Sequence, residues 1–122
     1  MQQTAIITGG TGGMGLATAR IIGVDHRIVL ADVDGGRLDR AVDELTAAGI
    51  EASGTVCDIT DRASVDALID DAERGGHVRA LIHTAGVSPQ MGDARFIARI
   101  NAVGTVNVVE SYLRVAGEGD AI

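Results

Sequence analysis

The sequence predicts an α/β fold in which helices cover a doubly wound parallel sheet, and three observations support this prediction. Apolar runs rich in β-branched residues alternate with segments of helical periodicity along the chain. The first run, Thr4–Thr8, ends in a turn with five glycines among the seven residues Gly9–Gly15. Hydrophobic residues make up 46% of the 122 residues but aromatic residues only 2%. The core must therefore consist of Ala, Val, Ile and Leu, which is typical of a buried parallel sheet.

Four segments are predicted to form the strands. The second of them is apolar on both faces, as a central parallel strand should be. The expected strands are Thr4–Thr8, Arg27–Ala31, Glu51–Cys57 and Val78–Thr84. Four successive β-α units imply a parallel sheet with right-handed crossovers. For a doubly wound sheet of the Rossmann type, truncated after the fourth unit, we expect the strand order 3-2-1-4. Residues 120–122 have the character of the first residues of a further strand.

Two helices are predicted next, one before and one after the second strand in the sequence. The first covers Gly13–Ile22 and is expected to bury one apolar face. The residues of that face are Met14, Ala17 and Ile21. The second begins at Arg37 and ends before Gly49, which stands where a left-handed C-cap is expected. Its apolar stripe consists of Leu38, Ala41, Val42, Leu45 and Ala48.

Two further helices complete the alternation. Thr60 or Asp61 can cap the third helix, which ends at the glycine pair 75–76. Its apolar stripe consists of Val65, Leu68, Ile69 and Ala72. A loop with the only proline, Pro89, leads to a long fourth helix from about 93 to 116. Because no linker or internal repeat interrupts the pattern, residues 1–122 are expected to form a single domain.

Charge and composition narrow the classes of partner and compartment. The formal net charge is -7, so neither nucleic acid nor an anionic membrane is expected as a partner. Cys57 is the only cysteine, which permits no intrachain disulfide and is expected to be a small buried residue. No apolar run reaches the ~18 residues of a membrane span. The N-terminus also lacks the pattern of a signal peptide, and we therefore expect a cytoplasmic protein.

The glycine-rich turn predicts nucleotide binding. It fits T-G-x-x-x-G-x-G, with Gly9, Gly13 and Gly15, and equally T-G-x-x-G-x-x-G, with Gly12 in place of Gly13. In either frame, glycine permits a positive φ and lets a phosphate approach the backbone N–H groups. The following helix directs its positive end at the same phosphate. A tight strand–helix turn would explain the glycines alone, but this order is typical of a Rossmann-type dinucleotide site.

An acidic residue at the end of the second strand favours the dinucleotide interpretation. Asp32 lies 17 residues after Gly15, about where a carboxylate would bind the adenosine ribose hydroxyls. A carboxylate there would repel a 2′-phosphate, and Val33, Asp34 and the glycine turn offer no positive charge. We therefore expect NAD rather than NADP as the cofactor. The alternative is a solvated carboxylate at the end of a strand.

With these motifs, the chain resembles the N-terminal half of a short-chain dehydrogenase/reductase over essentially all 122 residues. The resemblance rests further on Cys57-Asp58-Ile59-Thr60, Ala85-Gly86 and Asn101-x-x-Gly104. It implies hydride transfer between NAD and an alcohol or carbonyl substrate. It also implies that Asp58 bonds the adenine amino group and that Asn101 helps to organise a catalytic water chain. The cofactor-binding residues that it implies are Gly9, Thr11, Gly12, Gly13, Met14, Gly15, Asp32, Val33, Asp58, Ile59, Ala85 and Gly86.

Some features are similar to the extended branch of this family, which includes nucleotide-sugar epimerases and dehydratases. His83 and Thr84 replace two asparagines that the ordinary branch carries at the end of the fourth strand. The second glycine frame and the residues that follow Asn101 also fit the extended branch. The second helix resembles the ordinary reductase branch, which we favour.

The family's catalytic Tyr-x-x-x-Lys pair and its preceding Ser have no counterpart in the chain. Tyr112 is followed four residues later by Ala116, and the sequence contains no lysine. Tyr112 is expected to lie on the helix surface or at the edge of the core. We expect a fragment, and the alternatives are a half-protein that binds NAD without catalysis or a partner chain with the catalytic half. The open edge of the fourth strand predicts a homo-oligomer.

Other functions fit the sequence less well. A phosphate loop of the NTPase type needs a lysine. His26, His77 and His83 lie on separate elements, so no metal site is expected, and His83 is expected to be structural. The main alternative is a regulatory or redox-sensing module that binds NAD without catalysis. A methyltransferase, which also combines a glycine-rich loop with an acidic residue, is a weaker one.

Overall fold

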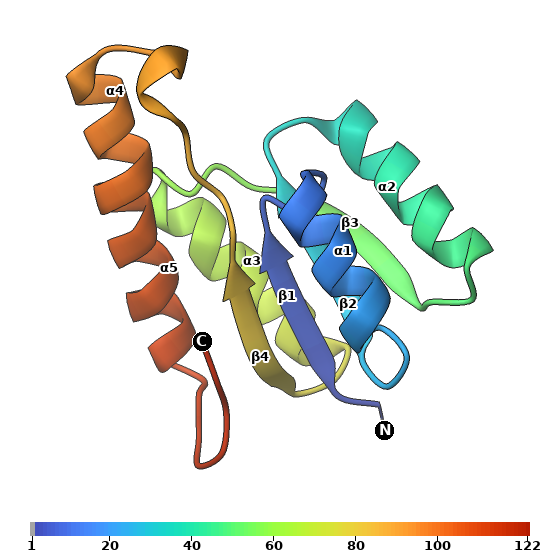
Figure 1. Ribbon diagram of the computed structural model, residues 1–122. Coiled ribbons are helices and arrows are strands. Elements are labelled where there is room, and N and C mark those ends of the chain that lie inside the picture. The colour runs from blue at the N-terminus through green and yellow to red at the C-terminus, as the bar shows by residue number, and fades with distance from the viewer. Residues whose placement is uncertain (1) are drawn as a thin grey trace.

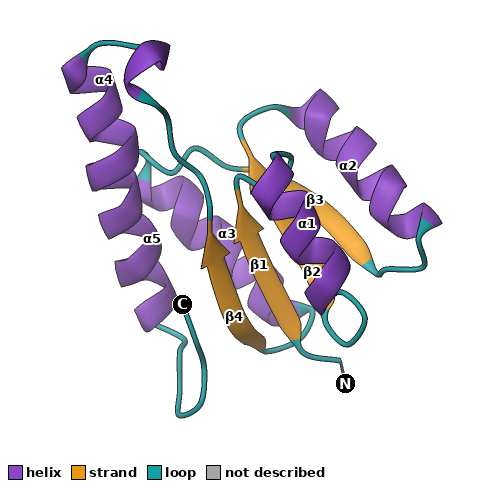
Figure 2. Cartoon of the chain, viewed as in Figure 1, coloured by secondary structure: helices purple, strands orange, loops and turns teal. Residues whose placement is uncertain are grey.

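The chain folds around a four-stranded parallel sheet. The computed structural model describes residues 2–122. The strands are β1 (Thr4–Thr8), β2 (Arg27–Asp32), β3 (Ala52–Val56) and β4 (Val78–His83). Their order in the sheet is β3-β2-β1-β4, which confirms the predicted order. Because every pairing is parallel, the carboxyl ends of all four strands lie at one edge of the sheet (Figure 2).

Helices cover both faces of the sheet (Figure 1). The helices α1 (Gly13–Ile22) and α2 (Gly35–Ala47) pack on one face, and α3 (Arg62–Arg74) and α5 (Gly104–Leu113) on the other. Alternate residues of β1 serve the two layers: Ile7 packs in the α1–α2 cluster and Ile6 in the α3–α5 cluster. All five residues of β1 are buried, as the apolar run at the N-terminus predicts.

Aspartate side chains set where two of the helices begin. α2 begins two residues earlier than predicted, because the Asp34 carboxylate accepts a 3.0 Å hydrogen bond from the Arg37 N–H. Asp61 caps α3 by accepting a 3.0 Å hydrogen bond from the Ala63 N–H. Of the two caps predicted for α3, Thr60 is therefore not the one used.

The face of α1 that packs on the sheet differs from the prediction. Met14 and Ile21 are 73% and 71% exposed, and Ala17 is exposed too. The buried positions are Gly15 and Ala19. The close approach of the glycine turn causes this rotation, because a Cβ at Gly15 would lie only 2.6 Å from the carbonyl oxygen of Gly9. The glycine face of the helix must therefore turn inward, and the larger side chains turn outward.

The predicted fourth helix is present but interrupted. It consists of α4 (Ala94–Ala98), a π-helical turn η2 (Arg99–Val103) and α5. α5 ends at Leu113, three residues before the predicted end. A short 3₁₀ helix, η1 (Pro89–Met91), lies in the preceding loop. Regular 3.6-residue periodicity cannot reveal a π turn, which often lies beside a functional site.

The chain's last residues touch the outer edge of β4. Ala121 forms a parallel bridge with Ala80, with hydrogen bonds to Arg79 and Leu81. The strand character predicted for residues 120–122 is thus present as a single bridge, and it occupies part of the edge of β4. No helix within residues 2–122 combines the length and the hydropathy that crossing a bilayer would need.

Candidate functional site

A cavity of about 340 Å³ lies at the carboxyl edge of the sheet. The loops that follow all four strands contribute to its walls. The predicted cofactor residues that line it are Gly9, Gly12, Asp32, Val33, Asp58, Ile59, Ala85 and Gly86. Its other lining residues are Ala31, Arg37, Cys57, Thr60, Thr84, Val87, Met91 and Ile100. The edge where parallel strands end is the usual ligand-binding position of an open α/β sheet.

Two glycines of the turn are required by contacts within the protein itself. Gly9 has a φ of 63°, which residues with a side chain rarely adopt. A Cβ at Gly9 would also lie 2.8 Å from the backbone N of Ala85. Gly15 cannot carry a side chain either, since its Cβ would meet the Gly9 carbonyl oxygen at 2.6 Å. Gly9 and Gly15 belong to both glycine frames, so these contacts favour neither frame.

Gly12 and Gly13 have a different surrounding from Gly9 and Gly15. A Cβ at Gly13 would meet nothing within 4 Å, and a Cβ at Gly12 would meet only the Gly9 carbonyl oxygen, at 3.4 Å. Gly12 is the N-cap of α1, and no side chain bonds the amides of the first turn. Those N–H groups lack helical partners, as at any helix start, and carry partial positive charge. The start of α1 thus combines free donors with open space, which suits an anionic group.

Asp32 lies at the end of β2 and is held from two sides. Its Oδ2 accepts a 2.6 Å hydrogen bond from the Thr11 hydroxyl, and its Oδ1 accepts a 2.8 Å hydrogen bond from the Val33 N–H. Val33 is 68% exposed, and its side chain is one wall of the cavity. Thr11 itself lines an adjoining groove rather than the cavity.

Asp58 follows β3 and lines the same cavity. Its Oδ1 accepts hydrogen bonds from the Thr60 hydroxyl, at 2.7 Å, and from the Thr60 N–H, at 2.9 Å. These bonds, with a smaller contribution from Arg99, lower the pKa of Asp58 below its ordinary value. Asp58 is therefore an ionised acceptor at neutral pH, held in place by the loop in which it lies.

Asn101 does not line the cavity but holds a loop that does. Its Oδ1 accepts a 2.9 Å hydrogen bond from the Val87 N–H, and its Nδ2 donates a 2.9 Å hydrogen bond to the Val87 carbonyl. A Cβ at Gly86 would lie 3.2 Å from Asn101 Oδ1. Asn101 lies in the π turn η2, so this interruption of the helix places the amide beside the β4 loop.

His83 belongs to a hydrogen-bonded chain between elements rather than to the cavity wall. Thr8 Oγ1 and His83 Nδ1 are 2.6 Å apart, and His83 Nε2 is 3.0 Å from Thr105 Oγ1. The Thr105 hydroxyl donates to the Asn101 carbonyl at 2.6 Å. His83 Nε2 is then the donor to Thr105, and Nδ1 accepts from Thr8. Burial lowers the pKa of His83, which keeps the ring neutral.

Tyr112 is a core residue, so its predicted place at the surface or the core edge is wrong. Its side chain is 1% exposed, and its hydroxyl donates a 2.8 Å hydrogen bond to the Val78 carbonyl. Burial raises the pKa of Tyr112 to about 12. The bulky ring is buried because α5 packs directly on β4, which the periodicity of the helix could not show.

Two other predictions concern cysteine and histidine. Cys57 is buried as predicted, and burial raises the pKa of its thiol. Cys57 follows the exposed Val56 and lies in the apolar cluster with Val65 and Leu68 of α3, which accounts for its burial. Among residues 2–122, no three His, Cys, Asp or Glu side chains gather as a metal-binding set.

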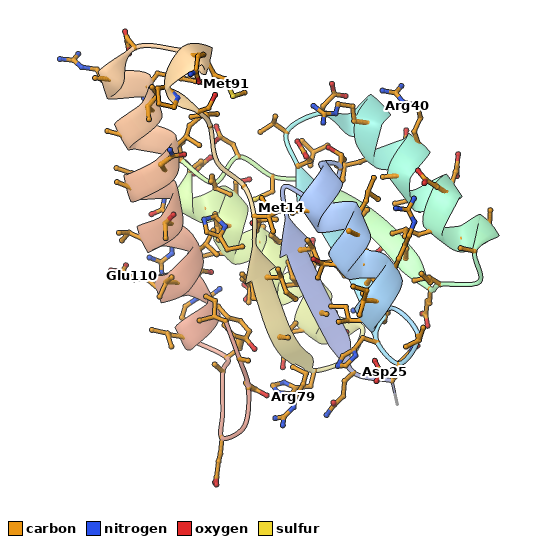
Figure 3. All side chains as sticks on the ribbon, in the orientation of Figure 1. Met14, Asp25, Arg40, Arg79, Met91 and Glu110 are labelled. Carbon is orange, nitrogen blue, oxygen red and sulfur yellow. The ribbon has the colours of Figure 1, made fainter. Side chains whose placement is uncertain are left out.

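The cavity also includes residues that the motifs did not identify. Arg37 is in the first turn of α2, which follows the end of β2, and no motif in the sequence marks it as a cavity residue. Val87 and Met91 come from a loop with no recognisable motif. Met91 lies toward the end of the molecule where the strands end, as do Met14 and Arg40 (Figure 3).

Comparisons with known proteins agree with this arrangement. The model of the family described as short chain dehydrogenase matches residues 3–120. The chain is 41% identical over 90 residues to polyketide synthase GfsA from Streptomyces halstedii. The aligned region covers 69% of this chain and 1% of that protein.

Two solved structures are similar over most of the chain. A short chain dehydrogenase/reductase from Burkholderia phymatum in complex with NAD has a TM-score of 0.83 and 35% identity, covering 93% of this chain and 43% of that one. A variant of actinorhodin polyketide ketoreductase with NADPH has a TM-score of 0.84 and 28% identity. The match covers 93% of this chain and 47% of that one. The chain thus spans less than half the length of each of these proteins.

Proposed function

The chain belongs to the short-chain dehydrogenase family, and on this premise we propose that it is the NAD-binding portion of an oxidoreductase. The reaction would transfer hydride between NAD and an alcohol or carbonyl substrate. One observation carries the proposal: a single cavity brings together the glycine turn, Asp32 and Asp58. Its volume of about 340 Å³ is at the lower end of the range for ligand pockets, which suits one nucleoside rather than a whole dinucleotide.

Each part of the cofactor has a matching group in this proposal. The pyrophosphate would lie against Gly12 and Gly13, where the first amides of α1 are free and no Cβ fills the space. The Asp32 carboxylate would accept hydrogen bonds from the adenosine ribose hydroxyls. Asp58, ionised and held by Thr60, would accept a hydrogen bond from the adenine amino group. Ile59, Ala85 and Gly86 would supply apolar and backbone contacts.

We propose that NAD is preferred to NADP because Asp32 places a negative charge where a 2′-phosphate would lie. Coulomb repulsion between these groups would be only weakly screened in a partly enclosed cavity. Arg37, which also lines the cavity, carries a positive charge that could partly offset it. The preference therefore depends on the carboxylate being held in the cavity, as its hydrogen bonds to Thr11 and Val33 suggest.

Bound NAD would supply the hydride acceptor, and this chain's residues would bind and orient it. Asn101 would act by holding Val87 at the cavity wall rather than by touching the adenosine half. Tyr112 does not suit proton transfer, because it is buried, bonded to a carbonyl and has a pKa of about 12. The proton-transfer group would come from a longer form of the chain or from a partner chain.

A second candidate is a module that binds NAD without catalysis. The burial of Tyr112, whose hydroxyl bonds the Val78 carbonyl, favours it. Both candidates require NAD binding, and they differ in turnover. A redox assay with NAD and a panel of alcohols would separate them, since only the first predicts reduction of NAD by the full-length protein.

Titration of the protein with NAD, NADP and S-adenosylmethionine tests the cofactor class. We expect NAD to bind most tightly. Binding of S-adenosylmethionine without NAD would instead support a methyltransferase and refute the proposal.

Asp32→Ala tests the ribose assignment. Loss of hydrogen bonds to a charged group should weaken NAD binding by about 10-fold or more, and NADP binding by less, because repulsion is lost as well. A matched control is Asp39→Ala, which removes an exposed carboxylate of α2 that does not line the cavity. Equal losses for NAD and NADP in the Asp32 variant would contradict the assignment.

A further inference from the structure

The glycine turn and the end of β2 are joined by one side-chain hydrogen bond. The Thr11 hydroxyl donates to Asp32 Oδ2 at 2.6 Å, across 21 residues of sequence. This distance is typical of a hydroxyl bonded to an ionised carboxylate, which is stronger than a bond between neutral groups. Thr11 is thus tied to the group that is proposed to bind the ribose.

The backbone of the turn determines where the Thr11 hydroxyl lies. Gly9 adopts a φ of 63°, and the Gly12 N–H donates to the Gly9 carbonyl at 3.1 Å, which closes the turn with Thr11 inside it. The Gly10 N–H donates to the Ala31 carbonyl at 3.2 Å, which fastens the turn to the end of β2. Thr11 therefore reaches Asp32 from a rigid backbone.

The two hydrogen bonds to Asp32 leave it able to bind a ligand. Thr11 occupies one acceptor position on Oδ2, and the Val33 N–H occupies one on Oδ1. Each carboxylate oxygen has about two acceptor positions, so each retains one. The carboxylate is held in one orientation with an acceptor left on each oxygen, which matches the two hydroxyls of a ribose.

Two arginines that form no ion pair share a groove with Thr11. The groove has a volume of about 280 Å³, and its charged residues are Arg37, Arg40 and Glu44. Glu44 pairs with Arg20, whereas Arg37 and Arg40 form no ion pair within residues 2–122. Arg37 lines both this groove and the cavity that contains Asp32. If Asp32 turned away, a 2′-phosphate in the cavity would face a cation without the opposing carboxylate.

We propose that Thr11 is a positioning residue that determines the choice between NAD and NADP. This inference rests on the proposed function. The Thr11 hydroxyl holds Asp32 in the orientation that accepts two ribose hydroxyls and opposes a 2′-phosphate. Thr11 acts through the carboxylate, and its effect on the cofactor disappears when the carboxylate is removed.

Calorimetric titration of Thr11→Val with NAD and with NADP tests this role, because valine keeps the shape of threonine without the hydroxyl. NAD affinity is expected to fall about 10-fold, while NADP affinity stays unchanged or rises. Thr11→Ser keeps a hydroxyl and should bind NAD within about 2-fold of the wild type. The matched control is Thr18→Val, because the Thr18 hydroxyl donates only to the Met14 carbonyl of its own helix. This variant should leave NAD affinity unchanged.

The same titration in an Asp32→Ala background separates positioning from direct contact. Adding Thr11→Val should then change NAD affinity by less than about 2-fold, because the carboxylate that Thr11 positions is absent. A 10-fold loss in that background would show that Thr11 binds the cofactor itself and would overturn the proposal. If Thr11→Val lowers the melting temperature markedly, Thr11→Ala provides the same comparison.

Two results would distinguish failure of this inference from failure of the proposed function. Wild-type protein that binds neither NAD nor NADP would refute both. Wild-type protein that binds NAD, together with a Thr11→Val variant that binds NAD equally well or loses both cofactors equally, would refute only the role of Thr11.

Discussion

Gly9 and Gly15 are predicted to be required for folding, before any ligand is bound. Gly9 combines a φ of 63° with a Cβ position 2.8 Å from the backbone N of Ala85. Gly15 has a helical backbone, but its Cβ would lie 2.6 Å from the Gly9 carbonyl oxygen. Both neighbours are backbone atoms, which cannot rotate away as a flexible side chain can. Alanine at either position should therefore destabilise the fold.

Four Gly→Ala variants separate the cost of a left-handed backbone from the cost of a steric conflict at the Cβ position. Gly49 has a φ of 84° and nothing within 4 Å of its Cβ position, so alanine there adds only left-handed strain, about 1–2 kcal/mol. Gly15→Ala adds only the steric conflict, about 1–3 kcal/mol. Gly9→Ala adds both, and its free energy of unfolding should fall by about 2–5 kcal/mol. Gly13→Ala adds neither and should be neutral or stabilising by about 0.4–1 kcal/mol.

Urea denaturation followed by circular dichroism measures these free energies. A domain of this size is stable by roughly 5–15 kcal/mol, so the Gly9 variant would lose a large share of its stability. The expected order, from most to least stable, is Gly13→Ala, wild type, Gly49→Ala and Gly9→Ala. A Gly9 variant as stable as the Gly49 variant would refute the reasoning, because the approach to Ala85 would then impose no constraint.

The other predictions concern binding, the core and pH. Gly13→Ala should weaken NAD binding without loss of stability, because a methyl group would fill the open space at the start of α1. A titration that gives wild-type NAD affinity would exclude Gly13 from the phosphate site. Tyr112→Phe should lower the free energy of unfolding by about 0.5–1.5 kcal/mol in urea, since a β4 carbonyl loses its donor, and should leave NAD affinity unchanged. Burial lowers the pKa of His83, so its contribution to stability is complete above its ordinary pKa of 6.5 and is lost as the pH falls; His83→Gln should remove that acid-side loss in urea titrations. The Glu73 carboxylate is the main group that raises the pKa of His77, so the contribution of His77 to stability is complete below its ordinary pKa of 6.5 and is lost as the pH rises. His77→Gln should therefore lower the free energy of unfolding below pH 6.5 and have less effect as the pH rises, and a loss confined to the alkaline side would contradict the assignment.

The elements of the fold were predictable because their signals are local. The bounds of β1 and α1 follow from an apolar run and from the glycines beside it. Gly49 adopts the positive φ expected of a left-handed C-cap. The inward face of α1 was not predictable, because hydrophobic periodicity favours Met14 and Ile21, whereas the helix turns Gly15 inward to approach the Gly9 carbonyl. Backbone proximity overrides the apolar pattern there.

The site was predictable to the extent that its residues lie in motifs. Asp32 was found because it ends a strand, and Asp58 because its motif resembles one in the short-chain dehydrogenase/reductase family. Both line the cavity, since parallel strands end at one edge of a sheet. Val87 and Met91 were not found, since an irregular loop without a motif brings them to the cavity. The role of Asn101 in holding Val87 depends on a π turn, which leaves no distinct pattern in the sequence.

The sequence by itself determined the strands, their parallel direction in the sheet and the glycine turn at the carboxyl edge of the sheet. Short-range signals suffice for these, because periodicity and glycine act within a few residues. Only the tertiary structure decided which distant groups meet there: Thr11 with Asp32 across 21 residues, and Gly9 with Ala85 across the β1–β4 pairing. The physical reason is that such contacts depend on how loops from separate strands converge, which no local pattern encodes.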